Sequence, residues 1–251
     1  LLTALFLLAW ELLARHMNAA YILPSPTQIL RCIYELRKPL LFVHLPATMA
    51  VVAVSLLLSL LLGIFLAILM DQSKTAERAL YPLLVASQTI PTTALAPLFV
   101  LWLGYGIWSK VLAAVLMTFF PIAVTLSDGF RAIPPEMTEL MQTLGATRWQ
   151  LFWKLKLAAV LPSFFTAIRM AIPLSVIGAA IGEWLGAQAG LGYFSRRMMT
   201  QLDGAGVFAP IVLLSVAAML LTALARQIET RALRFRNHQD SDQEETRRRD
   251  S

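Results

Sequence analysis

The sequence predicts an all-α integral membrane protein with about six transmembrane helices. Of the 251 residues, 58% are hydrophobic and 14% are charged, whereas about 25% of residues are charged in an average soluble domain. Several apolar runs reach the roughly 18 residues at which a spanning helix becomes the expected structure. They also exceed the alternating stretches of about ten residues that are typical of membrane barrels. The expected spans are 1–15, 45–70, 80–103, 108–128, 160–185 and 207–230.

The two ends of the chain differ in composition. A helix over residues 1–14 would cover about 21 Å of the roughly 30 Å hydrocarbon core, so we expect some N-terminal residues of the first span to be missing before Leu1. Residues 1–236 are expected to form one membrane domain. Residues 237–251 read NHQDSDQEETRRRDS, and because they contain no apolar side chain we expect a disordered tail.

Lysine and arginine residues predict which loops face the cytoplasm, because cytoplasmic loops of membrane proteins are enriched in both. If the N-terminus is inside, the loops on its side carry thirteen of these residues and the loops on the other side carry six. Both termini and the loop at 129–158 are therefore expected in the cytoplasm. These basic loops explain the formal charge of +6, and no nucleic-acid partner is expected.

The loop at 129–158 carries the signals of a helical hairpin. Four of its apolar residues share one helical face: Met137, Leu140, Met141 and Leu144. Gly145 stands where a left-handed residue ends a helix, and Thr147 with Gln150 has the spacing of a capping box. A second helix is expected over 148–157. By itself this pattern fits a plain anchor at the membrane surface as well as a docking element.

The stretch ELMQTLGA at 139–146, followed by a basic amphipathic segment and Leu161–Pro162, resembles the EAA loop of binding-protein-dependent ABC importer permeases. In that family the loop forms a coupling helix that docks into a groove of a cytoplasmic ATPase. The alanines of the EAA triplet are replaced here, and Ala158 stands where the family usually has proline. The resemblance assigns ATPase docking to seven residues: Glu139, Leu140, Met141, Leu144, Gly145, Ala146 and Thr147.

Four further segments resemble one branch of the same family, which handles nitrate, sulfonates, taurine and pyrimidine precursors of thiamine. They are YILPSPTQI, IPTTALAPLFVLWLGYGIWSK, FFPI and GEWLGAQAGLGY. The resemblance implies a multi-pass permease subunit in the bacterial inner (plasma) membrane. It would move a small solute, delivered by a periplasmic or extracellular binding protein, into the cytoplasm by alternating access. One EAA loop in each chain implies a homodimer.

The sequence contains no GxxxxGK[ST] loop, so ATP and Mg are expected on a separate ATPase chain. We expect no cofactor, no metal and no catalytic residue on this chain. Cys32 is the single cysteine, and His16, His44 and His238 are too far apart in sequence to show the spacing of metal ligands.

Charged residues inside the expected spans need partners or access to water, because they are costly in a bilayer. Lys110 and Asp128 lie at opposite ends of the span 108–128 and are expected to mark its two interfaces. Arg169 is expected to reach the cytoplasmic surface or to pair with Asp128.

Glu183 lies among glycines that recur at every fourth residue: Gly178, Gly182 and Gly186. Such a face allows close approach of helices, and we expect it at the dimer interface near an outer gate. The alternative is an interfacial carboxylate in water.

Prolines interrupt the third expected span, and proline in a spanning helix frees backbone carbonyls. Gln88, Thr89, Thr92 and Thr93 flank Pro91, and we expect them to line the pathway together with Glu183. Alternatively, their hydroxyls satisfy the freed carbonyls.

Two other functions fit an α-helical membrane protein. An ion-coupled secondary transporter or channel usually shows an inverted repeat or mid-membrane carboxylates, and an intramembrane enzyme needs a cluster of reactive side chains. The sequence shows neither. It does not decide between sulfonate, nitrate and pyrimidine, although the lack of a dense cationic cluster slightly favours the neutral pyrimidine.

Overall fold

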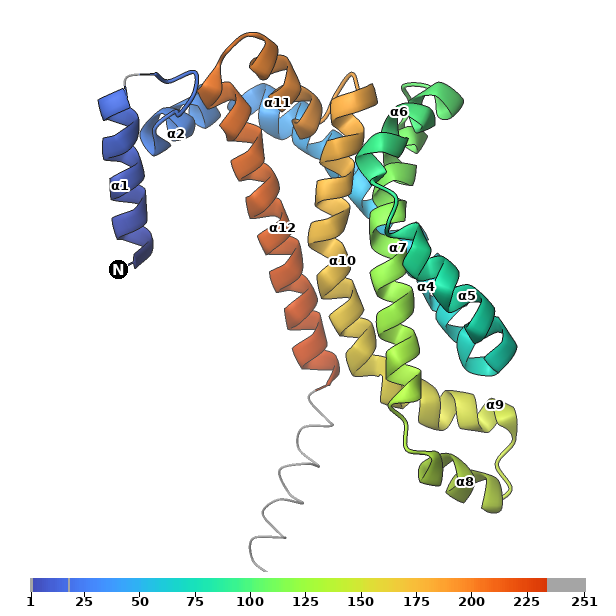
Figure 1. The fold of residues 1–251 in the computed structure, drawn as a ribbon. Helices are drawn as coiled ribbons and strands as arrows, with labels where there is room; N and C mark the ends of the chain where they lie inside the picture. Colours follow the sequence, from blue (N-terminus) through green and yellow to red (C-terminus); the bar gives the residue numbers. More distant parts are fainter. Residues whose placement is uncertain (1, 18, 234–251) are drawn as a thin grey trace, which may run out of the picture.

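The computed structural model describes residues 2–17 and 19–233, and the regular structure of these residues is entirely helical (Figure 1). The helices in chain order are α1 (Leu2–Met17), α2 (Pro26–Glu35), α3 (Arg37–Pro39), the π-helix η1 (Leu40–His44), α4 (Leu45–Gln72), α5 (Lys74–Ser87), α6 (Thr92–Leu103), α7 (Ile107–Arg131), α8 (Pro135–Thr143), α9 (Arg148–Leu151), the π-helix η2 (Phe152–Lys156), α10 (Leu157–Gly186), α11 (Leu191–Thr200) and α12 (Gly204–Ala232). The tail expected over 237–251 lies outside the described residues.

Four helical runs are long and apolar enough to cross a membrane: Arg37–Gln72, Ile107–Arg131, Arg148–Gly186 and Gly204–Ala232. They contain the spans expected at 45–70, 108–128, 160–185 and 207–230. The bent pair α5–α6 would make a fifth span. Helix α1 has 16 residues, and the count of six spans stays a prediction.

The third expected span, 80–103, is not one kinked helix. It divides into α5 and α6, which are bent by 94° at a break between them, so the expected interruption by proline is a full break rather than a kink within one helix. Pro91 has an extended backbone (φ −62°, ψ 115°), and proline also disfavours helical geometry in the residue before it. The helix therefore ends at Ser87 and restarts at Thr92.

Helix α7 lies at the centre of the bundle, with α4 and α10 packed along it (Figure 1). Small residues permit this close packing. A Cβ atom added to Gly178 of α10 would lie 2.6 Å from Cα of Ala114 in α7, and one added to Gly63 of α4 would lie 2.6 Å from a side-chain carbon of Ile122. Backbone approach of this kind is typical of helix pairs in membranes.

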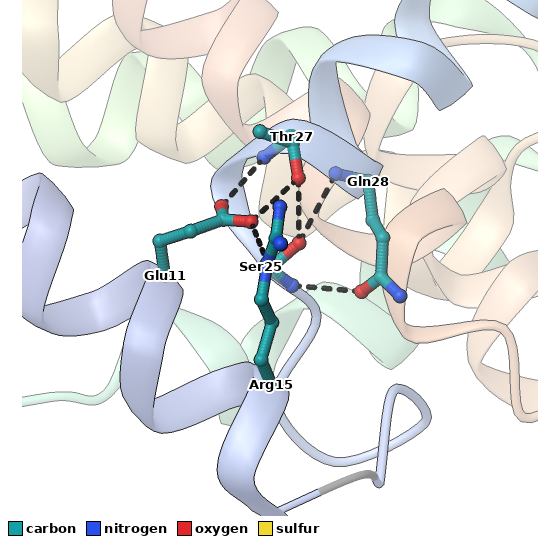
Figure 2. A network of polar contacts seen from close by, with 5 residues as sticks. All are labelled: Glu11, Arg15, Ser25, Thr27 and Gln28. Atoms are coloured by element: carbon teal, nitrogen blue, oxygen red, sulfur yellow. Dashed lines mark hydrogen bonds and ion pairs between the residues drawn. The ribbon is translucent and has the colours of Figure 1, made fainter.

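A polar network ties α1 to the start of α2 (Figure 2). Ser25 is the N-cap of this short helix, and Gln28 completes a capping box. Both carboxylate oxygens of Glu11 accept hydrogen bonds from Thr27, one from its hydroxyl (2.7 Å) and one from its backbone N–H (3.1 Å). Arg15 donates to the same carboxylate at 2.7 Å. Glu11 thus finds its partners at a helix N-terminus, where negative charge is favoured.

Candidate functional site

The candidate docking site is the hairpin at 129–158, which projects from the lower end of the bundle in Figure 1. Helix α8 ends at Thr143, and Gly145 follows with φ +81°, the left-handed geometry expected of it. Thr147 caps α9, with Gln150 completing the expected capping box. The second helix, however, does not stop near 157, because α9, η2 and α10 form one helical run.

The apolar stripe of α8 faces outward. Leu144 is 77% exposed, and Met137 and Leu140 are also more than half exposed. Glu139 lies exposed on the same helix, and the space around Gly145 is open. The seven residues assigned to docking are therefore continuous along α8 and its turn. Burial of such a stripe against a partner would be favourable, and exposed apolar patches are a common feature of interaction surfaces.

Two exposed tryptophans lie on the second helical segment of the hairpin and were not among the predicted docking residues. Trp149 of α9 and Trp153 of η2 are exposed, and their ring centroids lie 5.3 Å apart in an edge-on arrangement. Next to them Phe152 turns inward, with its ring 6.4 Å from that of Phe130 at the end of α7. The spacing of Trp149 and Trp153, four residues apart on one helical face, was the available signal.

The four polar residues expected around Pro91 flank the break between α5 and α6, and they differ in their surroundings. The Thr89 hydroxyl donates to the carbonyl of Ala86 at 2.7 Å, as in the alternative of satisfied carbonyls. Gln88 is exposed at the end of α5. Thr93 lines a cavity of about 680 Å³ whose other walls come from α10, α11 and α12. These walls are largely apolar and include Trp184, Ser195 and Ser215.

Glu183, the fifth residue expected to line the pathway, makes its hydrogen bonds with elements other than α5 and α6. It is 1% exposed, at the upper end of α10. One carboxylate oxygen accepts hydrogen bonds from the Thr48 hydroxyl at 3.0 Å and from Gly192 N–H at 2.8 Å. The same Thr48 oxygen accepts from Leu191 N–H at 2.8 Å. The carboxylate therefore joins α10, α4 and α11, and the alternative of an interfacial carboxylate in water is wrong.

The glycine face beside Glu183 packs within this chain. A Cβ atom at Gly182 would lie 2.8 Å from Cα of Lys110, and one at Gly186 would lie 2.3 Å from a Val100 methyl group. Because α6 and α7 already fill this face, the expectation that it packs against a second copy is wrong. The spacing of the glycines indicates close approach, but it does not identify the neighbour.

The structure also gives partners to two cations of the spanning helices. Lys110 lies in the first turn of α7, where it is buried and its ammonium donates to the carbonyl of Tyr105 at 3.4 Å; its place at a membrane interface stays a prediction. Arg169 pairs with Glu229 of α12 at 2.9 Å rather than with Asp128. Asp128 lies exposed at the lower end of α7, where it faces Arg131.

Comparison with known proteins identifies the family. Residues 59–234 match the family described as binding-protein-dependent transport system inner membrane component. The chain belongs to this family. The permease is 54% identical to the formylaminopyrimidine transport permease protein ThiX of Halalkalibacterium halodurans, over 94% of each chain. It is 34% identical to the riboflavin transport system permease protein RibX of Chloroflexus aurantiacus, over 86% of this chain and 81% of that one.

The fold of the permease also matches solved transporters. A solved inward-facing structure of the MetNI methionine ABC transporter is similar to this chain, with a TM-score of 0.66 and 21% identity over 74% of this chain and 93% of that one. The expected importer branch and the helical membrane fold are confirmed. The permease is an inner-membrane subunit of an ABC importer.

Proposed function

We propose that this permease carries a formylaminopyrimidine or a closely similar pyrimidine across the inner membrane. The observation that carries the proposal is the 54% identity to ThiX over 94% of both chains. The second relative is named for riboflavin, which also contains a pyrimidine ring, whereas sulfonate and nitrate are small anions. The largely apolar cavity beside Thr93 and Trp184 suits an uncharged ring, because an unpaired anion is costly to desolvate.

The hairpin is the proposed docking element for the ATPase. Its support is the exposed stripe on α8, the left-handed turn at Gly145 and the capped start of α9. ATP and Mg would bind to that separate ATPase chain, which would carry out the hydrolysis. A binding protein on the opposite side would deliver the solute, and two copies of the permease would enclose one pathway. Both termini and the hairpin would face the cytoplasm.

Purification of the complex in mild detergent tests the docking. The wild type should retain an ATPase with a phosphate-binding GxxxxGK[ST] loop, and mass analysis should show two permease copies. Glu139→Arg should lose the ATPase, because it reverses the charge at the proposed contact from a carboxylate to a cation. Glu35→Arg is the matched control, since Glu35 is an exposed carboxylate on α2 at the other end of the bundle. If the permease purifies alone in every case, the docking proposal is wrong.

Transport into liposomes that contain the permease, its ATPase and its binding protein tests the substrate. ATP-dependent uptake should occur with a formylaminopyrimidine, and excess taurine or nitrate should not compete. Uptake of taurine or nitrate in preference to the pyrimidine would contradict the proposed substrate and leave the importer assignment in place.

A further inference from the structure

The hairpin joins the bundle through two stem residues, Arg131 and Lys156. Arg131 is the last residue of α7, where the chain enters the hairpin, and Lys156 is the last residue of η2, where the chain returns to α10. Each stem residue is a cation, and each pairs with a carboxylate on the corner where α4 turns into α5. Both ends of the hairpin are therefore joined by ion pairs to the same corner between α4 and α5.

The Lys156 contact is the better enclosed of the two. Its ammonium donates to both oxygens of Asp71, at 2.7 Å and 2.8 Å, and the two side chains are only 21% and 10% exposed. Asp71 is the penultimate residue of α4. A partly buried pair with two short charge-assisted hydrogen bonds holds its geometry better than an exposed surface pair does.

The Arg131 contact reaches the other side of the corner. Its guanidinium donates to Glu77 in the first turn of α5. The same group lies over the ring of Tyr81, 5.1 Å from the centroid, one helical turn further along α5. Arg131 thus holds α5 by a charge contact and by a cation–π contact.

The corner itself has a defined geometry. Ser73 is extended (φ −140°, ψ 112°), and its hydroxyl oxygen accepts the N–H of Ala76 at 3.2 Å, which caps α5. Asp71 and Glu77 lie on either side of this cap. A displacement of the two carboxylates would therefore move the start of α5 with the end of α4.

A hollow of about 750 Å³ lies between the hairpin and α4. Its walls include Gln142 of α8, Arg148 of α9 and Ile68 of α4, and both Asp71 and Lys156 lie on its surface. The Lys156–Asp71 ion pair therefore connects the hairpin to α4 at the edge of this hollow.

We propose that Lys156–Asp71 and Arg131–Glu77 are the positioning contacts through which movement of the hairpin displaces the α4–α5 corner. Helix α5 then carries the displacement to the break before α6, beside Thr93 and its cavity. This inference rests on the proposed function, in which the hairpin receives force from the ATPase. It adds the route by which that force enters the membrane helices.

The test measures coupling in liposomes that contain the permease, ATPase and binding protein. Lys156→Gln and Asp71→Asn should retain the ATPase but lower the number of solute molecules transported per ATP hydrolysed by at least about fivefold, the low end of typical coupling between sites. Lys156→Arg keeps the charge and should keep the ratio. The exchanged pair Asp71→Lys with Lys156→Asp should restore part of the ratio, which a purely destabilising change would not do.

Hydrogen exchange gives a second readout that does not depend on transport. ATP binding should change the exchange of α5 amides in the wild type, and Lys156→Gln should abolish that change. Glu35→Gln is the control, because it removes an ion pair with Arg31 whose side chains are 58% and 80% exposed; it should alter neither readout.

Two results would overturn the inference, and they are distinguishable. If Lys156→Gln, Asp71→Asn and Arg131→Gln all keep the wild-type ratio and α5 response with the ATPase bound, the stem contacts do not position α5. If the wild type itself neither binds an ATPase nor transports, the proposed function fails and the inference fails with it.

Discussion

At the scale of single residues, buried polar groups are placed by partners from distant parts of the chain. Thr48 illustrates this, because its hydroxyl donates to Glu183 and accepts from Leu191, which lie 135 and 143 positions away. Close by in sequence, the hydroxyl can also donate to the carbonyl of His44, the last residue of η1, at 3.2 Å. Removal of this hydroxyl has a large effect, because it leaves the buried Leu191 N–H without its acceptor and takes from Glu183 one of the two donors to that oxygen.

Thr48→Val should therefore destabilise the permease by about 1–3 kcal/mol, the usual cost of leaving a buried polar group unsatisfied. The thermal unfolding midpoint in detergent measures the change. Ser55→Ala is the matched control, since Ser55 is equally buried and its hydroxyl donates to Val52 of its own helix. Equal effects of the two substitutions would show that the bridge from Thr48 contributes no special stability.

Cys32 should react slowly with a thiol reagent. Burial raises the pKa of its thiol, and the nearby carboxylates of Asp203 and Glu35 raise it further. The reactive thiolate is therefore scarce at neutral pH, and the labelling rate should still rise at a pH where that of an exposed cysteine has levelled off. A Glu35→Cys variant supplies that exposed cysteine for comparison. Rapid labelling of Cys32 at pH 7 would contradict the buried, protonated thiol.

At the scale of elements, the turn between α8 and α9 depends on one backbone geometry. Gly145 has φ +81° with open space where a Cβ would lie, and Gly106 has the same open space with φ −68°. A methyl group added at either position would touch no other atom. A difference between the effects of the two alanine substitutions therefore measures the cost of the left-handed backbone, about 1–2 kcal/mol. Thr147 reinforces the same turn by capping α9.

Gly145→Ala should lower the affinity of the permease for its ATPase by about tenfold, whereas Gly106→Ala should leave it unchanged. The reason is that alanine at position 145 disfavours the left-handed turn, which holds α8 in the orientation proposed to contact the ATPase. Titration of purified ATPase against the permease in nanodiscs measures both. An unchanged affinity with Gly145→Ala would mean that docking does not require this turn.

At the scale of the whole molecule, the fold separates two ends with different chemistry. The hairpin lies at the lower end in Figure 1, and α2 and α11 lie at the upper end. In the same view α1 runs upward and α12 runs downward, so their outer ends point toward the side of the hairpin. This arrangement agrees with the excess of basic residues in the loops on that side.

Labelling of single cysteines in intact cells should reveal this orientation. In a Cys32→Ser background, Glu35→Cys on α2 should react with a membrane-impermeant maleimide from outside. Glu136→Cys on α8 should react only after the membrane is permeabilised. Both carboxylates are exposed, so access to the reagent decides the outcome. The reverse pattern would invert the proposed orientation.

The sequence by itself determined the helical membrane class, most of the spans, the capping box at Thr147 and the left-handed turn at Gly145. These features follow from hydropathy and from contacts within a few residues, which neighbouring side chains fix. Only the tertiary structure decided that Glu183 accepts a hydrogen bond from Thr48. It likewise decided two ion pairs, Arg169 with Glu229 and Lys156 with Asp71. It also decided the 94° bend at Pro91. A proline indicates that a helix is interrupted, and a charge indicates that a partner is needed. The packing of helices distant in sequence sets the angle and selects the partner.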